Sequence, residues 1–340
     1  MPRPNFDYGV EVSQDNNLIL WKPDGERVAL IDGDMLPYII GYTISDMTLL
    51  RAKTRVKSGQ VEKLEDTPEC VAAFDRLNAL LNSWVYMAKC DAARVYMTDS
   101  AKNFRINLAF SQPYKGTRKT EKPPFFYEMR NYLLETHKAI ISDEEEADDL
   151  MSTEAWTRHF SLCEEHGIEI GSPEHRAFSD VVFASKDKDI KINVGWHVDL
   201  ETGELVWVDT LGWLTPTYKG KTLHKLKGAG IKFFYAQLIM GDTVDNYTGI
   251  PRKGMAFAYD LLDSCKTEKE CYQAVLKAYK DKYGDSYLAK NYRGGSRKVT
   301  AYEMMLEQGR LAHMQRWKGE IWRPKSSILW GHKEELWRGN

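Results

Sequence analysis

The sequence lacks any apolar run long enough to cross a membrane, since no stretch among its 340 residues approaches about 18 consecutive apolar positions. Its first residues, MPRPNFDYGVEVSQDNN, also lack the apolar centre that a secretory signal peptide needs. We therefore expect no membrane association and a cytoplasmic location.

Cysteine is scarce, and its spacing suggests no pairing. The chain has 5 cysteines, an odd number, and none of them stand in a C-x-x-C arrangement. Structural zinc sites and disulfide frameworks both use characteristic cysteine spacings, so we expect neither. The pattern fits a reducing compartment such as the cytosol.

A large excess of one charge is missing too, because the formal net charge is only −2. The total therefore gives no sign of nucleic-acid binding, but the distribution does. The segments 100–120, 210–241 and 286–302 carry several Lys or Arg residues and no Asp or Glu, while acids cluster elsewhere. Such segregation is typical of a protein that binds a polyanion at its flanks and cations at its centre. Chance clumping on a surface is the alternative.

Three short apolar runs each end in acids and predict buried strands. They are RVALIDGD with Asp32, ARVYMTD with Asp99, and DVVFASKDKD with Asp187 and Asp189. Amphipathic helices separate them, one opened by Pro68 and another in ADDLMSTEAWTRHFSLC. The alternation predicts an α/β fold with a parallel sheet, helices on both faces, and ligands beyond the carboxyl ends of the strands.

The remaining chain is predicted in four parts. Residues 1–26 form an extension without periodicity, and 192–211 alternate like a hairpin with a turn at 201–203. From Lys225 the sequence predicts only helices, beginning with HKLKGAGIKFFYAQLIMGD. Residues 321–340 form a tail without periodicity.

The acids at predicted strand ends and helix starts form one candidate metal site. Carboxylate oxygens without Cys or His select a hard cation, so we expect two Mg²⁺ or Mn²⁺ ions that act on a phosphodiester. The stretch SDEEEADDLM supplies part of the set, while its residues 143–145 are expected in solvent. A wholly solvated acidic loop is the alternative. The candidates are Asp32, Asp99, Glu146, Asp148, Asp149, Asp187, Asp189, Asp242 and Asp245.

Five motifs in order resemble the flap endonuclease/5′-nuclease superfamily, most closely the 5′→3′ exonucleases of short-tailed phages. They are IDGD, TDSAKNFRINLAFSQPYKGTRK, EADD, SKDKD and GDTVDNYTGIPRKG. The ending QGRLAHMQRWKGEIWRP is also similar to the close of those phage enzymes. The resemblance covers 28–324, nearly the whole chain.

The resemblance implies a Rossmann-like nuclease core at 27–224, which includes a helical arch at 114–140. It implies a helix–three-turn–helix region for DNA at 225–320, where a potassium ion can lie beside a phosphate. The first metal would be held by Asp32, Asp99, Glu146 and Asp148. The second would be served, partly through water, by Asp149, Asp187, Asp189, Asp242 and Asp245.

The resemblance also assigns roles to basic and aromatic residues. Arg105, Lys115 and Arg118 would engage the scissile phosphate. Arg105 could instead form an ordinary ion pair. Tyr114 would stack on a terminal base, with a core position as the alternative. The remaining DNA-binding candidates are Lys119, Lys225, Lys227, Gly249, Arg252 and Lys253.

One departure from the family pattern falls in the last motif. Arg252 stands where the family usually has the middle glycine of G-I-x-G-x-G, which puts a close backbone approach and the potassium site in doubt. A charged side-chain contact to phosphate could replace that approach.

The implied activity is cleavage of DNA, and of RNA in RNA–DNA hybrids, from free 5′ ends. For a phage, the implied roles are replication, breakdown of host DNA and recombination, in the cytoplasm of the host cell and beside replication proteins that the sequence does not identify. Two alternatives remain, a non-cleaving structure-specific DNA-binding subunit and a toxin-type ribonuclease with an acidic site.

Overall fold

The computed structural model describes residues 27–99, 102–117 and 121–324. The predicted extension at 1–26, Arg118, Lys119 and most of the predicted tail lie outside these residues. The chain forms two compact units that alternate along the sequence. Among the described residues, unit 1 comprises 27–99, 121–188 and 195–207, and unit 2 comprises 102–117, 189–194 and 208–324.

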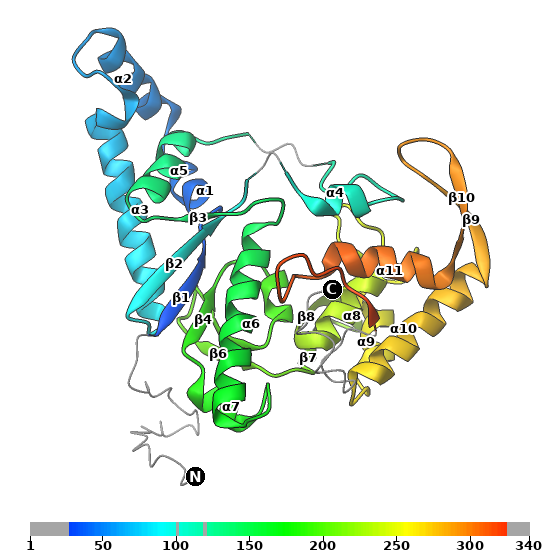
Figure 1. The fold of residues 1–340 in the computed structure, drawn as a ribbon. Coiled ribbons are helices and arrows are strands. Elements are labelled where there is room, and N and C mark those ends of the chain that lie inside the picture. Colours follow the sequence, from blue (N-terminus) through cyan, green and yellow to red (C-terminus); the bar gives the residue numbers. More distant parts are fainter. Residues whose placement is uncertain (1–26, 100–101, 118–120, 325–340) are drawn as a thin grey trace. The chain divides into compact units, whose positions relative to one another are not determined.

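The central sheet has six strands in the order β3-β2-β1-β4-β5-β6 (Figure 1). The pairs from β3 to β5 are all parallel. Read as 3-2-1-4-5-6, this is the order common in doubly wound sheets, and it reverses between β1 and β4. The strands are β1 (Val28–Asp32), β2 (Ala92–Met97), β3 (Ile140–Ile141), β4 (Val181–Ala184), β5 (Gly195–Val198) and β6 (Leu205–Val208).

Helices cover both faces of this sheet. Ala29 and Ile31 of β1 pack in one core with α1, α3 and α5, whereas α6 contacts β1, β2 and β4. The predicted α/β fold with a parallel sheet is therefore confirmed. The helices of unit 1 are α1 (Leu36–Gly41), α2 (Asp46–Lys57), η1 (Leu64–Asp66), α3 (Pro68–Met87), α5 (Phe126–Glu135), α6 (Ala147–His166) and α7 (Pro173–Phe178).

Local sequence explains where the long helices begin. Thr67 precedes α3, and its side chain accepts a hydrogen bond from the backbone N–H of Cys70, while Pro68 occupies the first helical position. At α6, Glu146 and Asp149 form a capping box in which each side chain bonds the other residue's backbone N–H. Both helices start where the sequence predicted.

The predicted hairpin at 192–211 is present as the adjacent strands β5 and β6, joined by a short turn in which Asp199 N–H donates to the Glu204 carbonyl. The rings of Trp196 and Trp207 lie 5.3 Å apart between centroids in an edge-to-face arrangement. These indoles therefore pack across the strand pair.

Unit 2 is built around α8, most of whose side chains are buried in one core. Trp322 also belongs to this core, so the start of the predicted tail is packed. The elements are α4 (Phe104–Leu108), η2 (Asp189–Ile192), β7 (Trp213–Lys219), β8 (Thr222–Ala229), α8 (Gly230–Met240), α9 (Met255–Leu262), α10 (Glu268–Tyr283), β9 (Ser286–Lys290), β10 (Ser296–Thr300) and α11 (Ala301–Ala312).

The prediction of helix from Lys225 onward is wrong for 286–290 and 296–300, which form β9 and β10. It is also wrong for 225–229. These residues belong to β8, which pairs antiparallel with β7, and α8 begins only at Gly230. Leu223 and Leu226 are spaced as on a helix, but pairing with the Thr- and Tyr-containing β7 decides the conformation. Gly228 fits this place because an added Cβ would lie 2.6 Å from Phe233 Cδ2.

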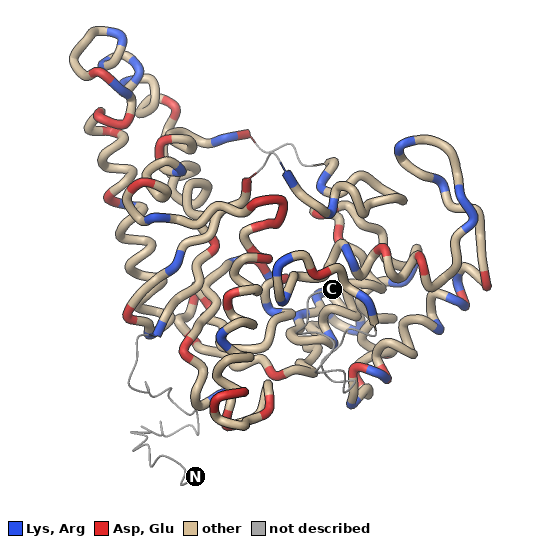
Figure 2. The backbone as a smooth tube through the Cα atoms, in the orientation of Figure 1, with Lys and Arg blue, Asp and Glu red and all other residues tan. Residues whose placement is uncertain are grey.

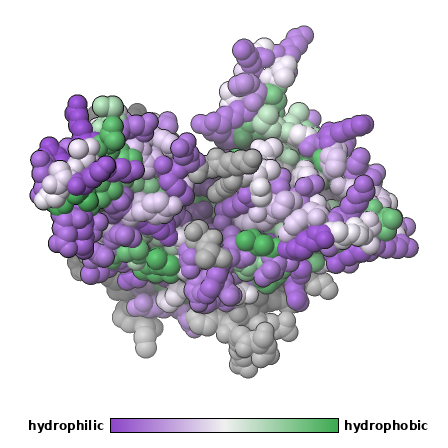
Figure 3. Space-filling view, turned by 90° about the horizontal axis from the view of Figure 1, so that it is seen from above, coloured by the Kyte–Doolittle hydropathy of each residue, from purple (hydrophilic) through white to green (hydrophobic). Residues whose placement is uncertain are grey.

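No helix within the described part of the chain is long and apolar enough to span a membrane. The face shown in Figure 3 is mainly hydrophilic, with small, separate hydrophobic areas.

Candidate metal and nucleic-acid site

The carboxyl edge of the unit 1 sheet brings acids from β1 and β4 together. Asp32 is the last residue of β1, and Asp187 follows β4 by three positions. Because β1 and β4 are parallel neighbours, their ends meet where the strand order reverses. In open α/β sheets this is the usual position of a ligand site.

Asp32 is buried, at 6% exposed, and lies among other acids. Its carboxylate accepts hydrogen bonds from Ser185 Oγ (3.2 Å) and from the Asp34 backbone N–H (3.0 Å). Burial, together with the negative charges of Asp34 and Asp187, raises the pKa of Asp32 to about 7. The site thus concentrates negative charge that a bound cation would relieve.

Asp34, which follows β1, forms contacts both with the residue after β2 and with α5. Its carboxylate accepts the Thr98 backbone N–H at 3.0 Å and pairs with Arg130 Nη1 at 2.9 Å. Arg130 also donates to the Thr98 carbonyl. The sequence did not predict the Asp34–Arg130 ion pair, because the two residues are 96 positions apart. Asp34 itself stands two residues after the predicted ligand Asp32.

The acidic stretch before α6 is visible as a continuous run in Figure 2. Asp149 is fully buried and takes part in the capping box with Glu146, so both carboxylates also fix the start of α6. Glu145, which was expected in solvent, is 5% exposed and accepts the Asp143 N–H at 3.1 Å. The prediction of a solvated approach is therefore wrong for Glu145.

The residues next to this stretch connect it to β2. The backbone N–H of Asp99 donates to Ser142 Oγ at 2.9 Å, and the N–H of Ala147 donates to Thr98 Oγ1 at the same distance. The predicted first-metal residues Asp32, Asp99, Glu146 and Asp148 all belong to unit 1.

Unit 2 gathers the remaining three acids around a buried tyrosine. The pKa of Tyr247 is raised well above its usual value by burial, and further by the negative charges of Asp189, Asp242 and Asp245. Asp189 accepts a hydrogen bond from the Gln237 side chain. Asp242 Oδ1 accepts the backbone N–H of Val244 (2.7 Å) and of Asp245 (3.1 Å), so it also shapes its own loop.

Lys115 and Tyr114 lie beside this group. Lys115 Nζ is 3.9 Å from Asp245 Oδ1, and Tyr114 Oη donates to Asp245 Oδ2 at 3.3 Å. The Tyr114 ring is buried in a small core with Ala109 and Leu311. A core position was the alternative to stacking on a base. Lys115 keeps a partly exposed side chain next to a candidate ligand.

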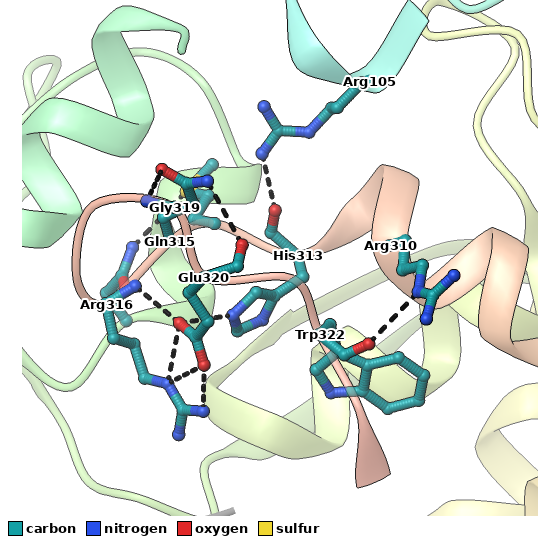
Figure 4. Close-up of polar contacts among 10 residues, drawn as sticks. Arg105, Arg310, His313, Gln315, Arg316, Gly319, Glu320 and Trp322 are labelled. Atoms are coloured by element: carbon teal, nitrogen blue, oxygen red, sulfur yellow. Dashed lines mark hydrogen bonds and ion pairs between the residues drawn. The ribbon is translucent and has the colours of Figure 1, made fainter. Parts of the chain in front are cut away.

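Arg105 is buried and bonds the end of α11. Its side chain is 2% exposed, and it donates to the carbonyl oxygens of Leu311 and His313 at the end of α11 (Figure 4). These carbonyls are among those that a helix leaves unpaired at its C-terminus. These contacts make Arg105 a structural cap of α11, and its engagement of the scissile phosphate stays a prediction.

The motif GDTVDNYTGIPRKG, predicted to form a helix–three-turn–helix, lies in the loop between α8 and α9. Gly249 has φ +58°, and an added Cβ would lie 2.4 Å from both Gly241 N and Ile239 O. The backbone N–H of Gly249 donates to Gln308 Oε1 at 2.9 Å. This amide, which was expected to contact a phosphate, therefore already has an acceptor. Arg252, with φ +68°, and Lys253 are exposed on this loop.

Lys225 and Lys227 are exposed on β8. As placed, the described His, Cys, Asp and Glu side chains form no group of three or more that could hold a metal ion. The candidate acids of both units nevertheless offer only oxygen donors, which is the donor chemistry that Mg²⁺ and Mn²⁺ prefer.

No protein-family model and no curated protein matches the chain. Solved structures that match include the phage T5 D15 protein crystallised with metal ions, at 15% identity and TM-score 0.43, over 84% of this chain and 88% of that one.

Two further matches are also from phage T5. One is the 5′-exonuclease with bound zinc, at 16% identity and TM-score 0.40, over 74% of this chain and 88% of that one. The other is a D15 flap endonuclease complex with DNA and metal ions, at 14% identity and TM-score 0.40, over 84% of this chain and 98% of that one. They are structures of the kind of enzyme that the sequence motifs resemble.

Proposed function

We propose that this chain is a divalent-metal-dependent nuclease that hydrolyses phosphodiester bonds of DNA, and of RNA in RNA–DNA hybrids, from 5′ ends. The observation that carries the proposal is the convergence of Asp32, Asp34 and Asp187 where the strand order of a parallel sheet reverses. Phage replication, breakdown of host DNA and recombination are the roles we propose for it.

The proposed ligands are the candidate acids of the sequence analysis. The first ion would be held by Asp32, Asp99, Glu146 and Asp148. Asp149, Asp187, Asp189, Asp242 and Asp245 would serve the second. Two bound Mg²⁺ or Mn²⁺ ions would lower the pKa of a water and neutralise charge on the leaving 3′-oxygen.

The chain's own residues do the positioning. Ser185 orients the Asp32 carboxylate, while the Asp34–Arg130 pair holds the end of β2. Preorganised groups of this kind need no rearrangement at the moment of reaction. Lys115 supplies a positive charge next to Asp245, where charge would develop on the scissile phosphate.

DNA is held mainly by the exposed cations of unit 2. Arg252 and Lys253 on the loop between α8 and α9, and Lys225 and Lys227 on β8, would contact phosphates. The potassium ion beside this loop stays a prediction.

The test is digestion of a 5′-labelled DNA duplex in Mg²⁺, with and without chelator, by the parent chain and Asp187→Ala. We expect cleavage only with free metal, and none by Asp187→Ala although it still binds the duplex. Asp75→Ala, which removes an exposed acid on α3, is the matched control and should cleave normally.

Other results would support the alternatives. Duplex binding without cleavage in any metal would indicate a DNA-binding subunit. Cleavage confined to single-stranded RNA would indicate a toxin-type ribonuclease. Near-normal cleavage by Asp187→Ala in Mg²⁺ would reject the metal assignment.

A further inference from the structure

The β9–β10 hairpin is a basic element that the candidate site does not use. Its segment, 286–302, contains Lys290, Arg293, Arg297 and Lys298 and no acid. Within unit 2 the hairpin extends beyond the ends of α10 and α11 (Figure 1). Lys and Arg positions gather along it (Figure 2).

The strand register separates the hairpin into two faces. Tyr287 lies opposite Val299, and Ala289 lies opposite Arg297, so these four side chains share one face. Ala289 and Val299 are buried, and the Tyr287 ring stacks on Tyr283 with centroids 4.4 Å apart. This face packs against the rest of unit 2.

The opposite face points to solvent. Lys290 lies opposite Ser296, and Leu288 lies opposite Lys298. Leu288 is 70% exposed, and Lys290, Ser296 and Lys298 are exposed as well. The face therefore combines two ammonium groups with one protruding aliphatic side chain, and carries no carboxylate.

Contacts at the tip fix the hairpin in place. Arg293 donates to the carbonyl oxygens of Ala109 (3.0 Å) and Ile106, and the Tyr292 N–H donates to the Phe110 carbonyl at 3.2 Å. The guanidinium of Arg297 lies 4.2 Å from the centroid of the Phe110 ring. Arg293 and Arg297 thus anchor the hairpin, which leaves Lys290 and Lys298 for a partner.

We propose that the outer face of β9–β10 binds the sugar–phosphate backbone of duplex DNA. Lys290 and Lys298 are diagonal neighbours across the strand pair, a relation that separates residues by about 7–8 Å. Their long side chains can therefore reach separate phosphates of one strand, while Leu288, directly opposite Lys298 and two residues from Lys290, contacts deoxyribose. The inference rests on the proposed function and adds a DNA-binding surface outside the motifs.

The test measures binding of a DNA duplex in chelator, so that no cleavage occurs, at several salt concentrations. Each lost phosphate contact lowers the salt slope by about 0.9. We therefore expect Lys290→Ala/Lys298→Ala to bind more weakly, with a slope smaller by about 2. Leu288→Ser should weaken binding without changing the slope.

Lys266→Ala/Lys269→Ala is the matched control, because it removes the same charge at the start of α10. That helix has 16 residues and spans about 24 Å before the hairpin begins. Binding by the control should equal that of the parent chain.

Two negative results have different meanings. No duplex binding by the parent chain would count against the proposed function itself. Normal parent binding with equal slopes for the hairpin variant and the control would overturn only the hairpin inference, and would point to another partner, such as an acidic protein. Thermal unfolding of each variant checks that the hairpin substitutions leave the fold intact.

Discussion

At the scale of single residues, Arg105 and Lys115 show how two basic side chains of one motif differ in role. Arg105 is buried and bonds carbonyls at the end of α11, whereas Lys115 is partly exposed beside Asp245. The sequence could not separate them, because the partners of Arg105 lie 206 and 208 positions away. A local motif contains no information on such contacts.

Lys115→Ala is expected to lower kcat by about 100-fold with a smaller change in KM, because it removes charge stabilisation from the transition state. Steady-state kinetics on a 5′-labelled duplex measures both constants. Lys53→Ala, which removes an exposed lysine on α2, serves as control and should change neither. A pure KM effect would make Lys115 an electrostatic guide for DNA.

Arg105→Ala should instead lower the free energy of unfolding by roughly 2–4 kcal/mol, since it leaves buried carbonyls without their charged donor. Urea unfolding measures this loss. A fully stable variant with a reduced kcat would restore the catalytic role that the sequence suggested.

Glu320 is expected to tie stability to pH. Burial alone would raise the pKa of Glu320, but the charges and hydrogen bonds of His313 and Arg316 lower it to about 2 (Figure 4). A carboxylate whose pKa is lower in the folded state stabilises the fold above its unfolded pKa. This stabilisation should fade as the pH falls from about 4.5 towards 2.

Glu320→Gln should therefore cost roughly 3 kcal/mol of unfolding free energy at pH 7, at about 1.4 kcal/mol per pKa unit. The difference in unfolding free energy between Glu320→Gln and the parent chain should become smaller below pH 4.5. Urea unfolding at pH 7, 4 and 3 measures it, with the exposed Glu165→Gln as control. A gap that stays constant with pH would contradict this explanation.

At the scale of elements, the loop from α8 to α9 depends on glycine where backbones meet. Gly249→Ala would combine a left-handed φ with a Cβ 2.4 Å from two backbone atoms. Gly220 has nearly the same φ, +62°, but an added Cβ would have no heavy atom within 4 Å. Gly220→Ala therefore measures only the cost of a left-handed φ, about 1–2 kcal/mol.

We expect Gly249→Ala to lose at least about 2 kcal/mol more stability than Gly220→Ala, because neither backbone neighbour can move aside cheaply. Thermal unfolding of the two variants makes the comparison. Equal losses would show that the loop opens to accept the methyl group.

The central strands and long helices were predictable because local signals and tertiary packing agree. Strand β1 is an apolar run buried on both faces, and α3 begins at a Thr-Pro cap. Asp32 and Asp187 were predictable for the same reason, since acids that end parallel strands reach one edge. The hairpins β7–β8 and β9–β10 were not, because Leu223 and Leu226 of β8 also fit a helix and β9–β10 has only two residues that are fully buried.

At the scale of the whole molecule, the candidate acids are divided between units that the sequence does not separate. The chain passes between the units at 99/100, 120/121, 188/189, 194/195 and 207/208. Contiguous domains at 27–224 and 225–320 stay a prediction from the resemblance, whereas contacts within the structure group discontinuous segments. Long-range packing of this kind has no local signature.

The predicted arch at 114–140 begins in unit 2 and ends in unit 1, so it is one of the connections between them. Two of its cations are already engaged in unit 1, Arg130 with Asp34 and Lys122 with the Tyr38 hydroxyl. Lys115, Arg118 and Lys119, at the start of the segment, are the cations that we predict guide a DNA strand along the arch.

If a strand passes beneath this segment, duplex DNA would be too wide, and the enzyme would need a free, locally unpaired 5′ end. We therefore expect streptavidin, added before the enzyme, to stop cleavage of a 5′-biotinylated duplex. The same duplex with biotin at its 3′ end should be cut normally, and closed circular duplex should resist. Undiminished cleavage with the 5′ end blocked would reject threading, while the metal chemistry, which Asp187→Ala tests separately, would stand.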